Sequence, residues 1–287
     1  MKSIRRFIAI ILIVAITSLT SILLSASNTN QSVESYVMNT IQDRGDGVAL
    51  LSDYHYEYDM EEYDYDPESM AIIVKNSIGD VIIRRSEEDI LKVDLYRVPS
   101  QFVTVNLMNN ELYVTTDQNF HFTTGVNNSR ITVQVPRDFR GYLNIQNNVG
   151  DVTVYPLNEL EDLQIYCNTG DIDIKGANVN GGTSIVSNTG DIVLSGATLK
   201  DSKISTSTGD IDFYGDFDGN ALFESNVGNV KVILNGAEND YSVELSGMGK
   251  CSYNSKSFSN SYSKTYAEAN NYLTASTAVG KVTVSFK

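Results

Sequence analysis

From residue 71 onward, apolar and polar positions alternate along the chain in a repeating order. In each copy an apolar residue stands five positions before a glycine, and apolar residues return two and four positions after it. The most regular copies centre on glycines spaced 19 or 20 residues apart: Gly150, Gly170, Gly190, Gly209 and Gly228. Residues two apart on a strand share a face, so each copy predicts a strand, a tight turn and a second strand, with aliphatic side chains pointing inward.

A single copy of this repeat cannot bury its apolar face alone. Stacked copies can, because each aliphatic column then contacts the same column in the coils above and below. The sequence therefore predicts an all-β fold, a single-chain parallel β-helix or similar β-solenoid with coils of about twenty residues. The longer gap between Gly249 and Gly280 contains a Ser-, Asn- and Tyr-rich stretch, residues 252–271, which we interpret as a loop inserted into an otherwise regular stack.

The turn of each copy has a chemistry of its own. A glycine at a fixed place indicates a backbone with positive φ. Two positions before it, polar residues recur that would stack into a ladder of side-chain hydrogen bonds along the axis. These residues are Asn148, Asn168, Asn188, Ser207 and Asn226. A second set of glycines predicts another corner in each coil, at Gly176, Gly196 and Gly215.

Longer alternating strands separate the first copy, at Gly79, from the regular array. Residues 90–96, 102–107, 111–114 and 130–136 are expected to form broader amino-terminal coils, with hairpin-like excursions at Asn109-Asn110 and Asn127-Asn128. Before them, residues 53–66 alternate aromatic and acidic side chains. This stretch is either an edge strand with one wet face or a solvated tether, and we favour the tether.

The amino terminus has the layout of a secretory signal. Lys2, Arg5 and Arg6 precede an apolar run over residues 7–24, and small residues follow. The run is also long enough to span a bilayer as an uncleaved anchor with its carboxyl side outside, so both alternatives stay open. Either one predicts an exported protein, secreted or held at the extracellular face of the cell membrane. The predicted order is a signal peptide or membrane anchor (1–27), a polar and then acidic, Tyr-rich linker (28–70), and the solenoid domain (71–287).

The net charge limits the class of binding partner, and the positions of the two cysteines bear on whether a disulfide can form. The formal net charge is −15, and so acidic a surface repels nucleic acid and anionic lipid. It fits a secreted protein kept soluble by self-repulsion, or one that recruits cations. Cys167 and Cys251 fall in the predicted inward columns of well-separated coils, too far apart for a disulfide, so we expect two free and buried thiols.

An aspartate follows most of the repeat glycines and forms the main candidate site. The column contains Asp80, Asp151, Asp171, Asp191 and Asp210, and Asp173 and Asp212 lie two positions further along. We favour the interpretation that each carboxylate accepts backbone N–H groups of its own turn. Stacked carboxylates about 5 Å apart would alternatively form a Ca²⁺-binding edge or the paired acids of a polysaccharide-cleaving site. Ca²⁺ is the one cofactor that this pattern indicates.

Two sequence features together carry a family resemblance. Val135-Pro136 and Asp138 lead into the first regular turn, and turns of the Asn-Thr-Gly-Asp-Ile type follow in series. This combination resembles the bacterial putative-adhesin domain family, a family of domains of unknown function, over residues 71–287. The resemblance implies a β-helical envelope domain, often behind an amino-terminal membrane segment. It brings no catalytic residues, because the family has no agreed ones.

The sequence gives no support to catalysis. His55 and His121 are the two histidines, and neither has a neighbour at metal-ligand spacing. No serine or cysteine stands in a nucleophile motif, and there is no glycine-rich phosphate loop. We therefore expect a non-catalytic, adhesin-like module of the cell envelope that binds a surface or cell-wall ligand, either a glycan or a protein. A membrane-anchored envelope-stress sensor or regulatory ectodomain is the alternative, and a polysaccharide-active β-helix enzyme ranks third.

Overall fold

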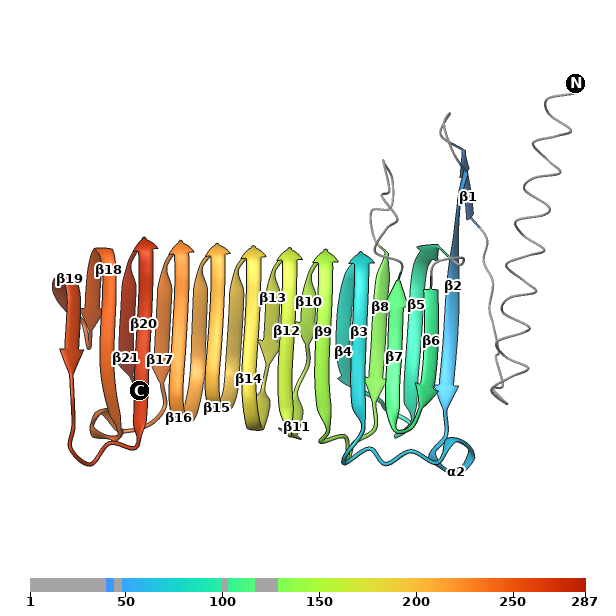
Figure 1. Ribbon diagram of the computed structural model, residues 1–287, viewed down its shortest axis with the longest axis horizontal. Helices are drawn as coiled ribbons and strands as arrows, with labels where there is room; N and C mark the ends of the chain where they lie inside the picture. Colours follow the sequence, from blue (N-terminus) through green and yellow to red (C-terminus); the bar gives the residue numbers. More distant parts are fainter. Residues whose placement is uncertain (1–39, 44–47, 100–102, 117–128) are drawn as a thin grey trace, which may run out of the picture.

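The chain folds into a stack of β-coils, shown in Figure 1. The computed structural model describes residues 40–43, 48–99, 103–116 and 129–287. Each regular coil contains a strand, the glycine turn, a second strand and a short third side that leads to the next coil. We call the strands that precede the repeat glycine the entry sheet and the strands that follow it the exit sheet.

The entry sheet is parallel and keeps its register from coil to coil. Its central strands are β9 (Tyr142–Val149), β12 (Asp162–Thr169) and the second halves of β14 (Ala177–Thr189), β15 (Ile192–Thr208) and β16 (Ile211–Val227). Buried residues align as direct partners across these strands: Ile145, Ile165, Ile185, Ile204 and Phe223. This column confirms the predicted inward face and the coil length.

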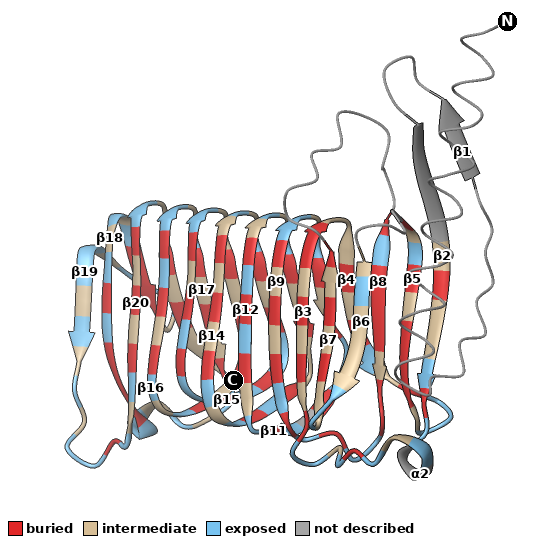
Figure 2. Ribbon diagram, turned by 45° about the vertical axis from the view of Figure 1, so that its right-hand side comes forward, coloured by how far each residue is buried: buried red, intermediate tan, exposed pale blue. Residues whose placement is uncertain are grey.

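The exit sheet stacks in the same way. Its strands are β4 (Asp80–Arg85), β10 (Val152–Val154), β13 (Ile172–Lys175), the first halves of β15 and β16, β17 (Val230–Leu234) and β21 (Val282–Phe286). Figure 2 shows buried and exposed positions alternating along the strands, as expected where one face is packed and the other is wet. A third side contains β11 (Leu157–Leu160) and the start of β14, which pair in parallel; the corner that leads into β14 is at Gly176, with φ +66°.

The repeat glycines are required for two separate reasons. Gly190 has φ +142°, and a Cβ there would lie 2.0 Å from the carbonyl oxygen of Gly170 in the coil below. The other turns share this geometry, with φ between +126° and +151° at Gly150, Gly170, Gly209 and Gly228. The predicted positive φ is confirmed, and the close approach of stacked turns excludes any side chain.

The predicted asparagine ladder is present in part of the stack. Asn168 donates from Nδ2 to Oδ1 of Asn148 at 3.1 Å, and Asn188 donates to Oδ1 of Asn168 at 2.8 Å. Within the described residues the ladder ends at Asn188, because neither Ser207 nor Asn226 continues it.

The amino-terminal coils do not follow the order of the sequence. β3 (Ala71–Ile78) lies between β7 (Glu111–Thr116) and β9, and β4 lies between β8 (Arg130–Val135) and β10. The chain therefore runs back past its first coil before the regular array begins. β5 (Leu91–Pro99) and β6 (Val103–Met108) add antiparallel strands at this end, and Asn109-Asn110 forms the predicted hairpin between β6 and β7. Asn127-Asn128 lies outside the described residues.

A strand precedes the first coil, in place of the expected tether. β2 (Val48–Tyr58) pairs antiparallel with β5, β1 (Thr40–Asp43) pairs with β2, and the short helix α2 (Met60–Tyr63) follows. Tyr54 and Tyr58 are buried, because the alternating pattern turns these aromatic rings toward the core. The tether interpretation is therefore wrong for this strand, and the edge-strand alternative is confirmed.

The carboxyl-terminal end also departs from sequence order. β20 (Asn271–Val279) pairs with β16 on one side and with β18 (Tyr241–Tyr253) on the other, so the coil of Gly280 lies between those of Gly228 and Gly249. After the short 3₁₀ turn η2 (Glu238–Asp240), β18 forms the outermost coil, and β19 (Lys256–Lys264) folds back on it as an antiparallel hairpin. The interpretation of residues 252–271 as a loop inserted into a regular stack is wrong: the stretch includes the strand that caps the stack.

Both cysteines are free and buried, in the columns predicted for them. Cys167 aligns with Asn147 and Ser187, and Cys251 aligns with Val282. Burial raises the pKa of the Cys167 thiol to about 11, with a contribution from the charge of Asp151, so the thiol stays protonated at neutral pH.

The amino-terminal predictions fall largely outside the described residues. The proposed signal peptide or anchor, residues 1–27, and His121 lie wholly outside them. Among the helices of the described part, none is long and apolar enough to cross a membrane. The division into residues 1–27, 28–70 and 71–287 stays a prediction.

Candidate functional site

A groove of about 670 Å³ lies on the outer face of the exit sheet, near its amino-terminal end. It extends over neighbouring strands in the order β2, β5, β8, β4 and β10. Its charged and aromatic lining includes Asp53, His55, Arg84, Asp94, Tyr96, Arg130 and Tyr155. We call this surface the amino-terminal groove.

The strand registers arrange the outward side chains in rows across the groove. The middle row runs from His55 through Asp94 and Thr132 to Ile82. A row on one side pairs Tyr96 with Arg130, and a row on the other side joins Lys92, Gln134 and Arg84. Because neighbouring strands are about 4.8 Å apart, residues from distant parts of the sequence become direct neighbours here.

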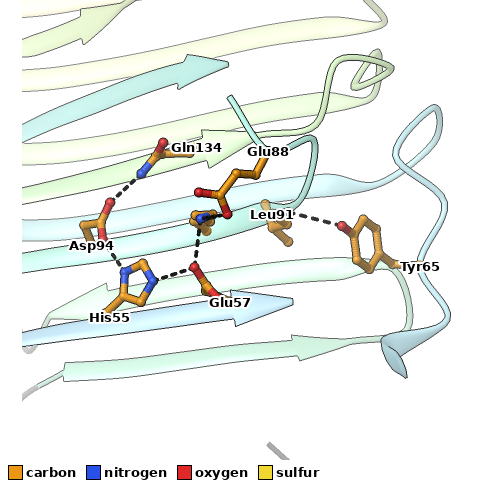
Figure 3. A network of polar contacts seen from close by, with 8 residues as sticks. His55, Glu57, Tyr65, Glu88, Leu91, Asp94 and Gln134 are labelled. Atoms are coloured by element: carbon orange, nitrogen blue, oxygen red, sulfur yellow. Dashed lines mark hydrogen bonds and ion pairs between the residues drawn. The ribbon is translucent and has the colours of Figure 1, made fainter. Parts of the chain in front are cut away.

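His55 is held between two carboxylates, as Figure 3 shows. Its Nδ1 lies 2.5 Å from Oδ1 of Asp94, and its Nε2 lies 2.8 Å from Oε1 of Glu57. Burial lowers the pKa of His55, but the hydrogen bonds and charges of Glu57 and Asp94 outweigh it and hold the pKa above the ordinary value of 6.5. The arrangement therefore favours the imidazolium form.

The carboxylates around His55 are themselves fixed by further contacts. Gln134 donates from Nε2 to the second oxygen of Asp94 at 2.6 Å, and Nζ of Lys92 lies 2.8 Å from Oε1 of Glu57 and 2.6 Å from Oε2 of Glu88. Hydrogen bonds from Lys92 and His55 hold the pKa of Glu57 below its ordinary value, even though burial acts in the opposite direction. This network links β2, β5 and β8 along one wall of the groove.

Two arginines, Arg84 and Arg130, stand beside the carboxylates of Asp53 and Asp94 in the groove lining. Arg130 lies over the ring of Tyr96, with Cζ 5.5 Å from the ring centroid, a cation–π contact. Arg84 is exposed on β4 on the far side of Thr132 and Ile82. Within the part of the chain that the structure describes, neither guanidinium has a carboxylate partner, although the chain carries a net charge of −15. Unpaired arginines with an aromatic neighbour are suited to an anionic group attached to an apolar or ring-bearing body.

The geometry around His55 does not resemble a catalytic base. Both ring nitrogens are engaged by carboxylates, so neither is directed at a ligand in the groove. The nearest hydroxyl in the middle row belongs to Thr132, which lies opposite Asp94. Thr132 is buried and makes no hydrogen bond with His55. In this arrangement the imidazole of His55 is not placed to abstract a proton from a ligand in the groove.

The predicted aspartate column is a ladder along the turn edge and lies apart from the lining of this groove. Each carboxylate accepts a hydrogen bond from the backbone N–H one coil further along: Asp151 from Asp171 at 2.9 Å, Asp171 from Asp191 at 2.8 Å, and Asp191 from Asp210 at 2.7 Å. The same bonds join Asp80 to Asp151 and Asp210 to Asn229. The expected kind of partner, a backbone N–H, is present, but it belongs to the neighbouring coil and not to the turn of the aspartate itself.

The two flanking aspartates lie on the outer face of the exit sheet. Asp173 is ion-paired with Lys175 at 3.0 Å, and Asp212 lies opposite Lys231 in the next coil. In the described part of the chain, no three His, Cys, Asp or Glu side chains gather into a group that could hold a metal ion. Ca²⁺ binding at the aspartate ladder stays a prediction.

The sequence marks the outward faces that line the groove but does not show that they lie side by side. The outward positions of the alternating strands carry His55 and Glu57, Lys92 and Asp94, and Arg130. Their many charges indicate solvent-exposed strand faces. The strand order β2, β5, β8, β4 depends on the reversed amino-terminal coils, and no local sequence pattern predicts that reversal. The groove residues therefore could not be grouped before the fold was known.

Comparison with known proteins places the fold in a defined group. The sequence model of the family described as Toastrack DUF4097 matches residues 69–287. No curated protein matched the chain.

Several crystal structures are similar to this chain. One is a putative cell adhesion protein from Clostridium sporogenes, with 13% identity and a TM-score of 0.37 over 82% of this chain and 99% of that one. A putative adhesin from Parabacteroides merdae has 16% identity and a TM-score of 0.39 over 83% and 96% of the two chains. A putative lipid binding protein from Parabacteroides distasonis has 11% identity and a TM-score of 0.33 over 82% and 96%.

Proposed function

The chain belongs to the Toastrack DUF4097 family, and from that premise we propose that it is a non-catalytic binding module at the outer surface of the cell. Its solenoid presents outward side chains on sheets that hydrogen-bond from coil to coil. Such a scaffold fixes the spacing of polar groups and lowers the entropy lost on binding an extended ligand.

The observation that carries this proposal is the pair of arginines in the amino-terminal groove. Arg84 and Arg130 have no carboxylate partner in the described structure, and Tyr96 and Tyr155 line the same groove. On a chain with a net charge of −15, two unpaired guanidiniums form a local attraction for anions. We infer that the ligand is a surface polymer that carries carboxylate, sulfate or phosphate groups on sugar rings.

A binding array tests this proposal. The full chain in mild detergent is applied to immobilised acidic glycans, neutral glycans and cell-wall fragments, with and without Ca²⁺. We expect binding to acidic polymers and weakening by salt, because phosphate and carboxylate contacts are screened. Binding that ignores ligand charge would contradict the proposal.

A pair of double variants locates the binding. Arg84→Gln with Arg130→Gln should reduce the affinity by about tenfold or more, as expected for the loss of two charge-assisted contacts. Arg137→Gln with Arg140→Gln removes the same charge from exposed positions outside the groove lining and serves as the matched control. Equal losses in both double variants would show that net charge, rather than the groove, determines binding.

The cellular location is part of the same proposal. We propose that residues 1–27 direct export and that the solenoid then lies outside the membrane, either released or anchored. Amino-terminal sequencing of the protein recovered from cells distinguishes the forms: a start near Asn28 indicates a released binder. An intact amino terminus in the membrane fraction indicates a tethered ectodomain and favours the sensor alternative.

A further inference from the structure

The stacked glycine turns form one edge of the solenoid, the turn edge, and the residues on it change from acidic to basic toward the carboxyl-terminal end of the stack. In stacking order, the position after the repeat glycine is occupied by Asp80, Asp151, Asp171, Asp191, Asp210, Asn229, Lys281 and Lys250. The position before the glycine is Ile78 and Val149 in the first two coils, and from there it changes from Thr169, Thr189 and Thr208 to Val227, Val279 and Met248. A hydrophilic acidic edge thus ends in an apolar and basic one, which we call the carboxyl-terminal patch.

The carboxyl-terminal patch is open to solvent. Met248, Val279 and Val227 are 82%, 59% and 48% exposed, on three successive coils. A hollow of about 550 Å³ lies between this apolar row and the two lysines. Neither Lys250 nor Lys281 has an ion-pair partner within the described residues. The solenoid core does not require an exposed apolar row at this position, since the equivalent residues in the three preceding coils are the threonines Thr169, Thr189 and Thr208.

Charge decides which partner fits this patch. An anionic membrane would be repelled, because Asp191 and Asp210 lie on the same edge and the whole chain carries a net charge of −15. A second copy of the chain offers a better match. Its aspartates and lysines come from the same stack, so both rows have the same spacing of about 4.8 Å per coil.

We propose that two copies of the chain associate edge to edge and antiparallel, with the two-fold axis at Asn229. Lys281 then faces Asp210 of the second copy, and Lys250 faces Asp191 of the second copy. Symmetry repeats both pairs, as in any isologous interface. The contact is compatible with the aspartate ladder, because only one oxygen of Asp191 accepts the backbone N–H of Asp210. Both oxygens of Asp210 accept from Asn229, at 3.2 Å for Oδ2, but a carboxylate oxygen has a second lone pair that can accept from Lys281.

The same register accounts for the apolar row. Val227 meets Val227 of the second copy at the axis, and Met248 and Val279 lie against Thr189 and Thr208 of the second copy. Shifting the axis to the next coil would oppose the two Lys281 side chains, so the register is set by charge. Exposed ion pairs are individually weak, and the dimer is therefore sensitive to salt.

Analytical ultracentrifugation of the full chain in mild detergent tests the proposal. We expect a monomer–dimer equilibrium at low salt that shifts to monomer at high salt. Lys250→Glu with Lys281→Glu should raise the dissociation constant by at least about tenfold, because four attractive pairs become repulsive. A chain that stays monomeric at low salt would overturn the proposal.

Matched variants separate the patch from general charge effects. Lys200→Glu with Lys203→Glu changes the net charge equally at exposed positions away from the turn edge, and should leave the equilibrium unchanged. Met248→Ser should weaken the dimer without changing charge. If the Lys200 and Lys203 changes weaken association as much as those at Lys250 and Lys281, the proposed contact is wrong.

Mixing two defective variants gives the sharpest result. Asp191→Lys with Asp210→Lys should be as monomeric as the Lys250 and Lys281 double variant, yet an equal mixture of the two should form heterodimers, because every facing pair is again opposite in charge. Thermal unfolding checks that the aspartate variant is folded. Should it fail to fold, the lysine variants alone decide. A folded pair that does not associate on mixing would contradict the proposed register.

Discussion

His55 connects two carboxylates at the wall of the amino-terminal groove, so its protonation state affects the local charge directly. Glu57 and Asp94 accept hydrogen bonds from its ring, and Lys92 and Gln134 hold those carboxylates in place. The pKa of His55 in the folded protein is raised above 6.5. The stabilisation is therefore fully present below pH 6.5 and is lost as pH rises through the higher pKa of the folded state.

The upward shift of the His55 pKa gives a prediction for His55→Gln. The variant should lose more stability relative to the original chain below pH 6.5 than well above it, because only the imidazolium attracts both carboxylates. Chemical denaturation at several pH values measures the difference in the free energy of unfolding between the two proteins, which cancels the titration of all other groups. A difference that is constant across the pH range would show that His55 has no coupled titration.

Asp171 allows a direct test of the aspartate ladder. Its carboxylate accepts the backbone N–H of Asp191 at 2.8 Å. Asp171→Asn keeps an acceptor oxygen and should leave stability close to that of the original chain, whereas Asp171→Ala removes the acceptor and should cost about 1 kcal/mol. Urea denaturation measures both. If the asparagine variant lost as much stability as the alanine variant, charge and not the hydrogen bond would be the contribution of this residue.

At the scale of the elements, the glycine turn between two strands determines how closely coils can stack. Gly190→Ala would place a Cβ against the carbonyl oxygen of Gly170 at positive φ, and should cost at least about 3 kcal/mol or prevent folding. Gly182 is the control, since no atom lies within 4 Å of a Cβ built there and its φ is not positive. Thermal unfolding compares Gly190→Ala with Gly182→Ala, and equal losses would contradict the stacking argument.

The regular coils could be predicted because each coil repeats the same pattern of apolar, polar and glycine positions. Ile165, Gly170 and Ile172 each have an equivalent in the next coil, so inward face, turn and coil length follow from the sequence alone. The ends were not predictable in the same way. Gly249 and Gly280 both match the repeat, but their order in the stack depends on the pairing of β20 with β16 and β18. Strand pairing across such distances leaves no local pattern in the sequence.

The candidate sites differ in the same way between repeated and unrepeated parts of the chain. The aspartate ladder was visible because it repeats with the turns, whereas the groove was not, because His55, Asp94 and Arg130 come from strands that occur once. The burial of Tyr54 and Tyr58 shows why residues 53–66 could not be assigned from the sequence. A Tyr- and acid-rich stretch is ambiguous between tether and strand until a partner strand is available, and β5 is that partner.

At the scale of the whole molecule, the solenoid separates two surfaces along one axis. The strands that line the amino-terminal groove, β2, β5, β8 and β4, lie toward one end of the stack, and β18 and β20, which carry most of the carboxyl-terminal patch, lie toward the other (Figure 1). The repeats between them are acidic along the turn edge and hold the two surfaces at a fixed distance. An edge-to-edge dimer built on the patch would leave the groove of each copy free, so the proposed ligand binding and the proposed self-association would not compete.

Hydrogen–deuterium exchange of the full chain, with and without the acidic polymer selected on the array, tests the central claim most directly. Binding in the amino-terminal groove should slow exchange in β2, β5, β8 and β4, the strands that carry His55, Asp94, Arg130 and Arg84. The turn edge from Gly150 to Gly228 should be unchanged. Protection confined to that edge or to the entry sheet, with no change in the four groove strands, would contradict the account.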